Sequence, residues 1–477
     1  MDMALKVKVG GMEDVELSEP VSPTGQYFNS SVLCVSVIGV LEFDNPIDDS
    51  SSIALINDVF LPINTRFSSI MVEDKDGEKH WKRVEVKGED HIVVPRFPEG
   101  LSPESYDQYF NDYLSKIAMD SLPQTRPLWE IHIVKYPTSN ASGSLVFKLH
   151  HALGDGFSLM GALLSCLQRA DNPSLPLTFP SFQKAPKPDN EIKSLISIVP
   201  HAFSSALNTV LDFGWSILKS SFLEDSRTPI RSGEEGVEFR PINIMTMTFS
   251  LDKIKQIKSI LQVTINDVVT GMIFLGTRLY MEATSEEARN ARSTALVLLN
   301  TRSIGGYKSV DEMVQNQEAQ IQWGNKFGFL HVSIPELHQY ERSLDPLKFV
   351  HEARDIIKRK RNSSAVYLTG KLLEFVRRYR GPEATAEYIH STLKNSSMTV
   401  SNMIGPLEKM TLANQPVKGL YFMVVNIPQS LTVTMMSYMD QLRVAVGTEK
   451  DLIDPVKFKN CTEQAFSMMF NVAVKSK

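Results

Sequence analysis

The alternation of apolar and polar positions is clearest between residues 144 and 167. Residues 144–150, SLVFKLH, alternate with a period of two, which predicts a β-strand. Residues 157–167, FSLMGALLSCL, form an apolar run that is typical of a helix. Asp155 and Gly156 stand just before this run, where an aspartate caps a helix N-terminus. The pattern therefore predicts a strand, a short loop and a capped helix.

Similar patterns predict a mixed α/β domain for residues 1–170. Short apolar runs bounded by turn residues predict strands, and longer runs with helical periodicity predict helices. Besides the strand and helix above, the predicted strands are 32–43, 67–72, 91–94 and 129–136, and the predicted helices are 48–60 and 102–121.

A second α/β domain is predicted for residues 237–477. Five prolines between residues 171 and 190 exclude a continuous helix or a central strand there, so residues 171–236 begin as a linker. The second domain has predicted strands at 243–249, 295–302, 325–335, 398–406, 420–425, 431–439 and 442–446, and helices at 251–261, 267–281, 346–361, 370–379 and 454–474. The last three strands are expected to complete one sheet through short turns.

The crossover segment at about 191–223 carries apolar residues at helical spacing. Residues 194–211 have no formal charge, which brings this stretch near the lower length limit of a membrane span. Pro200, His201 and four serines disfavour a span, and a helix on the membrane surface suits the composition better. An amphipathic helix packed on the protein itself is the alternative, and the sequence leaves both open.

Composition and charge narrow the class of protein. The chain has 477 residues with 42% hydrophobic and 22% charged residues, which is ordinary for globular domains. The net charge of −5 gives no indication of the basic surface that nucleic-acid binding requires. The three cysteines are far apart and form no metal-binding or disulfide pattern. The N-terminus has no long apolar core, so we expect the protein to work in reducing, cytosol-facing conditions.

The loop at the end of the predicted strand carries the candidate chemistry. If the strand continues through His150 and His151, the two imidazoles point to opposite sides and only one faces a given cleft. A neutral histidine at that place has the pKa to take a proton from an alcohol and make it nucleophilic toward a thioester. Asp155 and Gly156 also suit a plain turn and helix cap, with Gly156 supplying backbone freedom.

The motif HHALGDG at residues 150–156 resembles the HHxxxDG signature of the CoA-dependent acyltransferase superfamily. In that superfamily the second histidine is the general base, which corresponds to His151 here, and the aspartate is mostly structural. Three further stretches narrow the resemblance to the wax ester synthase/diacylglycerol acyltransferase family. They are PLWE at 127–130, Asn266-Asp267, and SNMIGP at 401–406. SPTGQYF at 22–28 resembles the plant branch of that family.

The resemblance implies a fold, a reaction and partners. The expected fold is α/β, with two related mixed-sheet domains of the CoA-dependent acyltransferase (chloramphenicol acetyltransferase-like) type and a tunnel at their interface. The expected reaction moves a fatty acyl group from acyl-CoA, a substrate rather than a cofactor, to a long-chain alcohol or diacylglycerol. No metal and no nucleic acid are expected. The plant members are associated with membranes, so we expect contact through about 191–223, at the cytosol-facing endoplasmic reticulum membrane or the plasma membrane.

The resemblance also assigns roles to residues. His151 is expected to deprotonate the acceptor, which attacks the thioester directly, while His150 and Asp155 hold the loop. The expected substrate-binding residues are Gly156, Trp129, Asn266 and Asn402, the last also as a donor to the oxyanion.

Each of these assignments has a plainer interpretation. Trp129 is also typical of a core anchor, helix capping alone explains Asn266-Asp267, and SNMIGP also suits a strand end and turn. DFGW at 212–215 is similar to a motif of plant alcohol acyltransferases, but its position inside a helical pattern indicates chance. Two other functional classes stay open: a superfamily enzyme with another acceptor, such as a condensation domain, and a non-catalytic lipid-binding relative.

Overall fold

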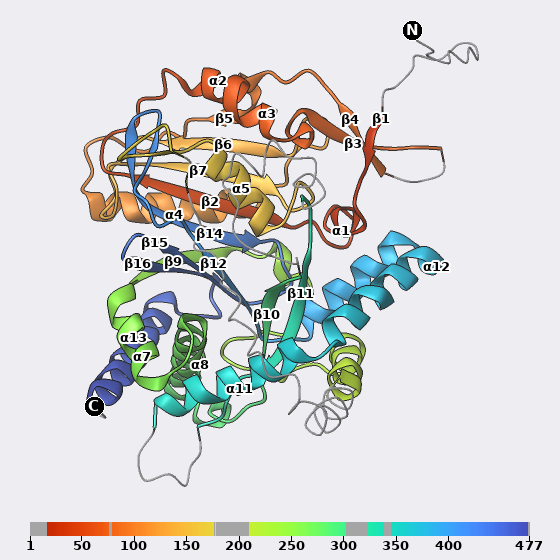
Figure 1. The fold of residues 1–477 in the computed structure, drawn as a ribbon, viewed down its shortest axis with the longest axis vertical. Coiled ribbons are helices and arrows are strands. Elements are labelled where there is room, and N and C mark those ends of the chain that lie inside the picture. The colour runs from red at the N-terminus through yellow and green to blue at the C-terminus, as the bar shows by residue number, and fades with distance from the viewer. Residues whose placement is uncertain are drawn as a thin grey trace, which may run out of the picture.

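Two large β-sheets, one in each half of the chain, organise the protein (Figure 1). The computed structural model describes residues 17–75, 79–175, 177, 209–301, 323–337 and 345–475. A third, three-stranded sheet formed by β1 (Leu17–Pro20), β4 (Lys79–Arg83) and β3 (Ser69–Glu73) lies at the edge of the first half.

The first sheet has seven strands, with the histidine motif at the end of a central one. Strand β7 (Gly143–His150) is buried along its whole length because it lies between β6 and β2 and is covered on both faces. Helix α5 (Gly156–Ser165) contributes to the apolar core on one face, and helix α4 (Pro103–Met119) packs on the other. In order, the strands are β5 (Ile92–Val93), β6 (Trp129–Val134), β7, β2 (Ser36–Phe43), β14 (Gln415–Val425), β13 (Met410–Leu412) and β8 (Gln168–Arg169).

The second sheet has six strands and carries a helical layer on one face. Its order is β11 (Phe327–Ser333), β10 (Thr294–Asn300), β12 (Met398–Ile404), β15 (Leu431–Tyr438), β16 (Gln441–Glu449) and β9 (Ile242–Ser250). Helices α7 (Leu251–Leu261), α8 (Ile265–Thr284), α11 (Leu347–Asn362) and α13 (Pro455–Lys475) bury their apolar stripes against it. Helix α12 (Ala365–Lys394) projects to one side in Figure 1 and bends at Gly381, whose φ is 88°.

Two strands from the second half of the chain belong to the first sheet. Strand β14 pairs antiparallel with β2, and β13 pairs with β8, so residues 410–425 extend the first sheet and not the second. The predicted single sheet of 420–425, 431–439 and 442–446 is therefore wrong, because the chain changes sheets before β15. Strand β14 buries apolar residues on both faces, which suits its position next to β2 at the junction of the halves.

A buried ion pair joins the two sheets. The Glu42 carboxylate of β2 accepts a hydrogen bond from the Arg443 guanidinium of β16 at 2.5 Å. Burial raises the pKa of Glu42, and the charge of Arg443 opposes this rise. Gly419 of β14 must lack a side chain, because a Cβ there would lie 2.2 Å from the Glu42 carboxylate. Loss of one partner would leave the other charge uncompensated, so the pair fixes how the halves meet.

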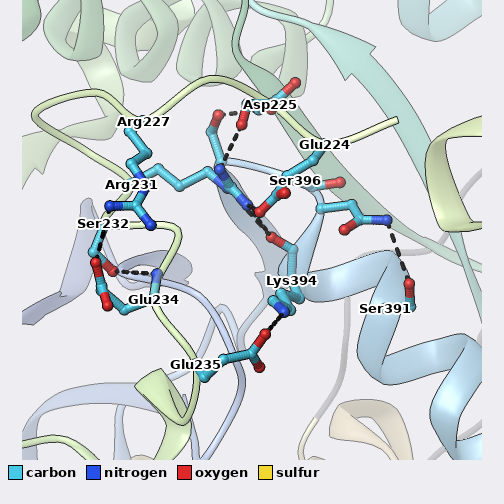
Figure 2. Close-up of polar contacts among 12 residues, drawn as sticks. Glu224, Asp225, Arg227, Arg231, Ser232, Glu234, Glu235, Ser391, Lys394 and Ser396 are labelled. Atoms are coloured by element: carbon cyan, nitrogen blue, oxygen red, sulfur yellow. Dashed lines mark hydrogen bonds and ion pairs between the residues drawn. The ribbon is translucent and has the colours of Figure 1, made fainter. Parts of the chain in front are cut away.

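Polar contacts hold the loop at residues 224–235, which leads into the second half of the chain (Figure 2). The Asp225 carboxylate accepts the backbone N–H of Thr294 at 2.6 Å, at the start of β10. The Arg231 guanidinium donates to the carbonyl oxygen of Lys394 at 2.9 Å, at the end of α12. These contacts satisfy backbone groups at the end of a strand and of a helix, so the loop is part of the second domain.

The predicted membrane segment is described only in part. Residues 191–208 lie outside the described residues, and residues 209–221 form a helix on the second half, drawn yellow-green in Figure 1. DFGW lies inside this helix, as its helical pattern predicted. Within the described chain, no single helix has both the length and the apolar character to cross a membrane. One bent pair, Leu251–Leu261 with Ile265–Thr284, meets that test jointly, on length and composition alone.

Candidate active site

The histidine motif forms the predicted strand, loop and capped helix. Strand β7 ends at His150, and α5 begins at Gly156. The backbone N–H of His151 donates to Val35 O at 2.9 Å, so the first residue of the loop is still held by the chain that leads into β2. The local pattern was therefore sufficient to place both histidines at the end of a buried strand.

His150 is fully engaged on both ring nitrogens. Its Nδ1 accepts the backbone N–H of Ala152 at 3.1 Å, so the ring proton lies on Nε2. Nε2 faces the Cys34 sulfur at 3.4 Å. Burial, with smaller contributions from His151 and nearby lysines, lowers the pKa of His150 to about 3. His150 is thus a neutral residue that holds the turn.

His151 contacts a side chain from the second half of the chain. Its Nδ1 lies 2.8 Å from Asn325 Oδ1, and Asn325 Nδ2 donates to the His151 carbonyl oxygen at 2.9 Å. The side chain is buried, and burial lowers the pKa of His151, while the charge of Asp155 and the hydrogen bond to Asn325 oppose that change. A histidine of this kind is neutral near pH 7, which is the state a general base requires.

Aromatic rings from both halves surround the His151 imidazole. The Phe28 ring centroid, next to α1 (Pro23–Tyr27), lies 4.6 Å from that of His151, and the Phe327 centroid of β11 lies 5.7 Å away. The two phenyl rings stack on each other at 6.0 Å. The imidazole therefore has an apolar environment that favours its neutral form and suits an acyl chain.

Asp155 joins the motif to the second half. Its Oδ1 accepts the backbone N–H of Ser158 at 3.1 Å, which confirms the predicted helix cap. Its Oδ2 accepts the backbone N–H of Lys326 at 2.9 Å, and its own N–H donates to Gly324 O at 3.3 Å. The carboxylate thus fixes both the start of α5 and the approach of the segment that carries Asn325.

Residues 323–326 bind the histidine loop as a continuous segment. Trp323 Nε1 donates to Leu153 O at 2.8 Å, and the Ser158 hydroxyl donates to Gly324 O at 3.1 Å. In Figure 1 this segment continues into β11, which extends from the second half toward α5 and α1. The site is therefore built at the junction of the two halves.

Two of the predicted substrate-binding residues have structural roles instead. Trp129 is fully buried, stacks on His91 and donates its indole N–H to Phe67 O at 2.9 Å. It is a core anchor, which corrects its prediction as a substrate contact. Gly156 has no left-handed backbone conformation, but a Cβ there would lie 2.7 Å from the Met403 sulfur of β12. It makes room for the second half and does not supply turn flexibility.

The structure brings the other two, Asn266 and Asn402, together. Asn402 Nδ2 donates to Asn266 Oδ1 at 3.0 Å, and Asn266 lies in the capped first turn of α8. Side chains alternate along β12, so Met403 faces Gly156 while Asn402 lies on the face that α8 covers. The pair connects two predicted motifs, and its role toward substrate stays a prediction.

Sequence reasoning missed the side chains that complete the site. Phe28 ends the stretch SPTGQYF, which supported the resemblance but had no assigned role. Asn325 is the first residue of the predicted strand 325–335 and Trp323 lies two residues before it, and no local pattern distinguishes either. Asn325 is 174 residues from His151, so only the tertiary structure brings the two together. Among the described residues, no cluster of His, Cys, Asp or Glu could hold a metal ion.

Comparisons with known proteins find matches over most of the chain. The domain described as "Wax ester synthase/diacylglycerol acyltransferase catalytic domain" matches residues 100–269, and "WS/DGAT C-terminal domain" matches residues 323–470. Wax ester synthase/diacylglycerol acyltransferases 4 and 6 of Arabidopsis thaliana are 29% and 28% identical to the chain. The alignments cover 95% and 93% of this chain and 90% and 91% of those proteins.

Solved structures confirm the predicted fold class. A wax ester synthase/diacylglycerol acyltransferase from Marinobacter aquaeolei matches with a TM-score of 0.58 at 15% identity, covering 95% of this chain and all of that one. The first condensation domain of the CDA synthetase matches with a TM-score of 0.53 at 12% identity, covering 92% and 90%. At these identities the likeness concerns the fold.

Proposed function

Because the chain belongs to the wax ester synthase/diacylglycerol acyltransferase family, we propose that it transfers a fatty acyl group from acyl-CoA to the hydroxyl of a long-chain alcohol or diacylglycerol. The two family domains together span about two thirds of the chain. One observation carries the assignment of the site: His151 is a buried neutral imidazole in an aromatic environment at the junction of the halves.

In the proposed reaction, His151 takes the proton of the acceptor hydroxyl as its oxygen attacks the thioester carbonyl. The tetrahedral intermediate collapses with cleavage of the C–S bond, and the proton returns from His151 to the CoA thiolate. The products are one ester and free CoA, with no acyl-enzyme. His150 and Asp155 hold the loop that carries His151 through the contacts described above.

The assay that tests this proposal uses the purified full chain with labelled palmitoyl-CoA, and with hexadecanol or dioleoylglycerol as acceptors in parallel. We expect labelled ester and free CoA in equal amounts with at least one acceptor, and the product ratio identifies the preferred one. Chromatography of the lipids and a thiol assay measure the two products. Stable binding of palmitoyl-CoA without ester formation would overturn the proposal in favour of a lipid-binding protein.

We also propose that the helix at 209–221 contacts the membrane from which the lipid acceptor comes. Leu211, Trp215, Leu218 and Phe222 recur at spacings of four, three and four residues, and their exposed fractions are 60, 38, 45 and 77%. This spacing places them on one face of the helix and its end. Such a continuous exposed apolar face is unusual for a globular surface and is typical of a helix that lies on lipid.

Charge beside this apolar stripe favours an anionic surface. Asp212 of the helix pairs with the buried Lys360 at 2.9 Å, which holds the last turn of α11 next to the helix, while Arg359 and Arg361 of that turn are exposed. Basic residues that flank an apolar helical face add electrostatic attraction to anionic lipids. The cytosol-facing side of the endoplasmic reticulum membrane, or the plasma membrane, is the proposed location.

We expect the double variant Trp215→Glu/Phe222→Glu to lower binding to vesicles of phosphatidylcholine and phosphatidylserine by at least 10-fold, because two charges must then enter the interface. Co-sedimentation measures the bound fraction. Val456→Glu is the matched control, since Val456 is 65% exposed on α13, which lies on the opposite side of the molecule in Figure 1. Equal vesicle binding by the double variant and the native chain would contradict the proposal.

A further inference from the structure

We propose that Asn325 is a positioning residue that fixes the His151 tautomer and so makes Nε2 the basic atom. This inference rests on the proposed function, in which His151 is the base. Asn325 comes from the second half of the chain, immediately before β11, whereas His151 ends a strand of the first.

The hydrogen bonds assign the direction of both groups. The His151 carbonyl oxygen only accepts, so the Asn325 atom 2.9 Å from it must be the NH₂ group. The other amide atom, 2.8 Å from His151 Nδ1, is therefore the carbonyl oxygen, which also only accepts. Nδ1 must then carry the ring proton. A flipped Asn325 amide would place oxygen against oxygen and would lose one of the two hydrogen bonds.

The two adjacent histidines consequently hold opposite tautomers. In His150 the backbone N–H of Ala152 occupies Nδ1, which leaves the proton on Nε2. In His151 the Asn325 oxygen holds the proton on Nδ1, which leaves the lone pair on Nε2. Only His151 therefore offers an unprotonated Nε2, and this difference explains physically why the second histidine is suited to act as base.

The contact also links the base to the docking of the two halves. Asn325 lies between Gly324, whose carbonyl accepts from the Ser158 hydroxyl, and Lys326, whose N–H donates to Asp155. Its backbone position is thus fixed on both sides by the histidine motif. A general base must lie within a fraction of an ångström of its working position, and a misplacement of 1 Å costs about 100-fold in rate.

The ionisable groups near His151 make a charge change at Asn325 measurable. Asp155 is the charged neighbour that raises the pKa of His151 against burial, and His150 stays neutral beside it. Phe28 and Phe327 cover the ring. A carboxylate in place of the Asn325 amide would therefore stabilise the imidazolium form directly, with little screening by water.

The test compares Asn325→Ala and Asn325→Asp with the native full chain in acyl transfer. We expect Asn325→Ala to lower kcat about 100-fold, with the KM for palmitoyl-CoA changed less than 3-fold. We expect Asn325→Asp to move the acidic limb of the kcat–pH profile upward by about one pH unit or more, so that its activity recovers as the pH rises. A purely structural role would not produce this shift.

Matched controls come from Asn111, an exposed residue in the middle of α4. Asn111→Ala and Asn111→Asp should retain the native kcat and pH profile, and thermal unfolding shows whether each variant folds. If His151→Ala is inactive while both Asn325 variants match the native chain, this inference fails and the proposed function stands. If His151→Ala is fully active, the role of His151 as base fails, and this inference fails with it.

Discussion

Replacement of His151 by alanine is expected to lower kcat for acyl transfer by about 1,000-fold or more, with little change in thermal unfolding. General base catalysis contributes about 10²–10⁴-fold, and here the base is also the group that orders the attacking hydroxyl. The imidazole makes one side-chain hydrogen bond and two ring contacts, so its loss disturbs the fold less than the chemistry. Initial rates with labelled palmitoyl-CoA and a saturating acceptor measure the effect.

The pH dependence of the native enzyme gives the same assignment a second test. The base works when it is neutral, so kcat falls as the pH drops through the pKa of His151. Burial lowers that pKa below the ordinary histidine value of about 6.5. We therefore expect kcat to be level from about pH 7 to pH 8 and to decline only on the acid side of pH 6.5.

His151→Gln provides the near-isosteric control for this prediction. Its amide can still contact Asn325, but it cannot accept a proton at neutral pH. Its kcat should fall as much as that of His151→Ala. Its kcat–pH profile should show no acidic limb at a higher pH than the native profile does. Retention of more than a tenth of the native kcat by both folded variants would exclude His151 as the base.

Local sequence patterns were sufficient for the elements that carry the chemistry. The period of two before His150 and the apolar run after Asp155 placed a strand end and a capped helix correctly, because both depend on neighbours within a few residues. Helix capping at Asn266-Asp267, the plainer interpretation of that motif, is also present, because Asp267 forms a capping box with Thr264. Periodicity predicted two α/β domains, and the resemblance supplied their acyltransferase type.

Long-range pairing explains what the sequence did not predict. Strand β14 was expected beside β15, since neighbouring strands usually pair, but it inserts next to β2 in the other sheet. The sequence left two interpretations of Trp129, a core anchor and a substrate contact. Its full burial in the structure identifies it as a core anchor. Asn325 belongs to no local motif, because its role in the site depends on a contact with His151 across the junction of the two halves.

Asp155 is expected to show the second-largest effect, because its carboxylate serves both halves of the site. In Asp155→Ala, the N–H groups of Ser158 and Lys326 lose their acceptor at once. We expect the free energy of unfolding to fall by about 2–6 kcal/mol, at about 1–3 kcal/mol for each donor left without its acceptor. We expect kcat to fall about 100-fold, because both the histidine loop and the segment that carries Asn325 lose their common anchor.

A variant at the helix cap of α7 serves as a control that lowers stability without changing the site. Ser250 caps α7 by accepting the Lys253 N–H at 3.4 Å. Ser250→Ala should cost about 1 kcal/mol of stability and leave kcat unchanged.

The pH profile of Asp155→Asn adds a readout that destabilisation alone cannot mimic. The charge of Asp155 raises the pKa of His151, so its removal moves the acidic limb to lower pH. The asparagine has one acceptor oxygen, and its NH₂ group faces one of the two N–H donors, so it should rescue only part of the stability. A folded Asp155→Asn with native kcat and an unshifted acidic limb would show that the carboxylate neither positions nor tunes the base.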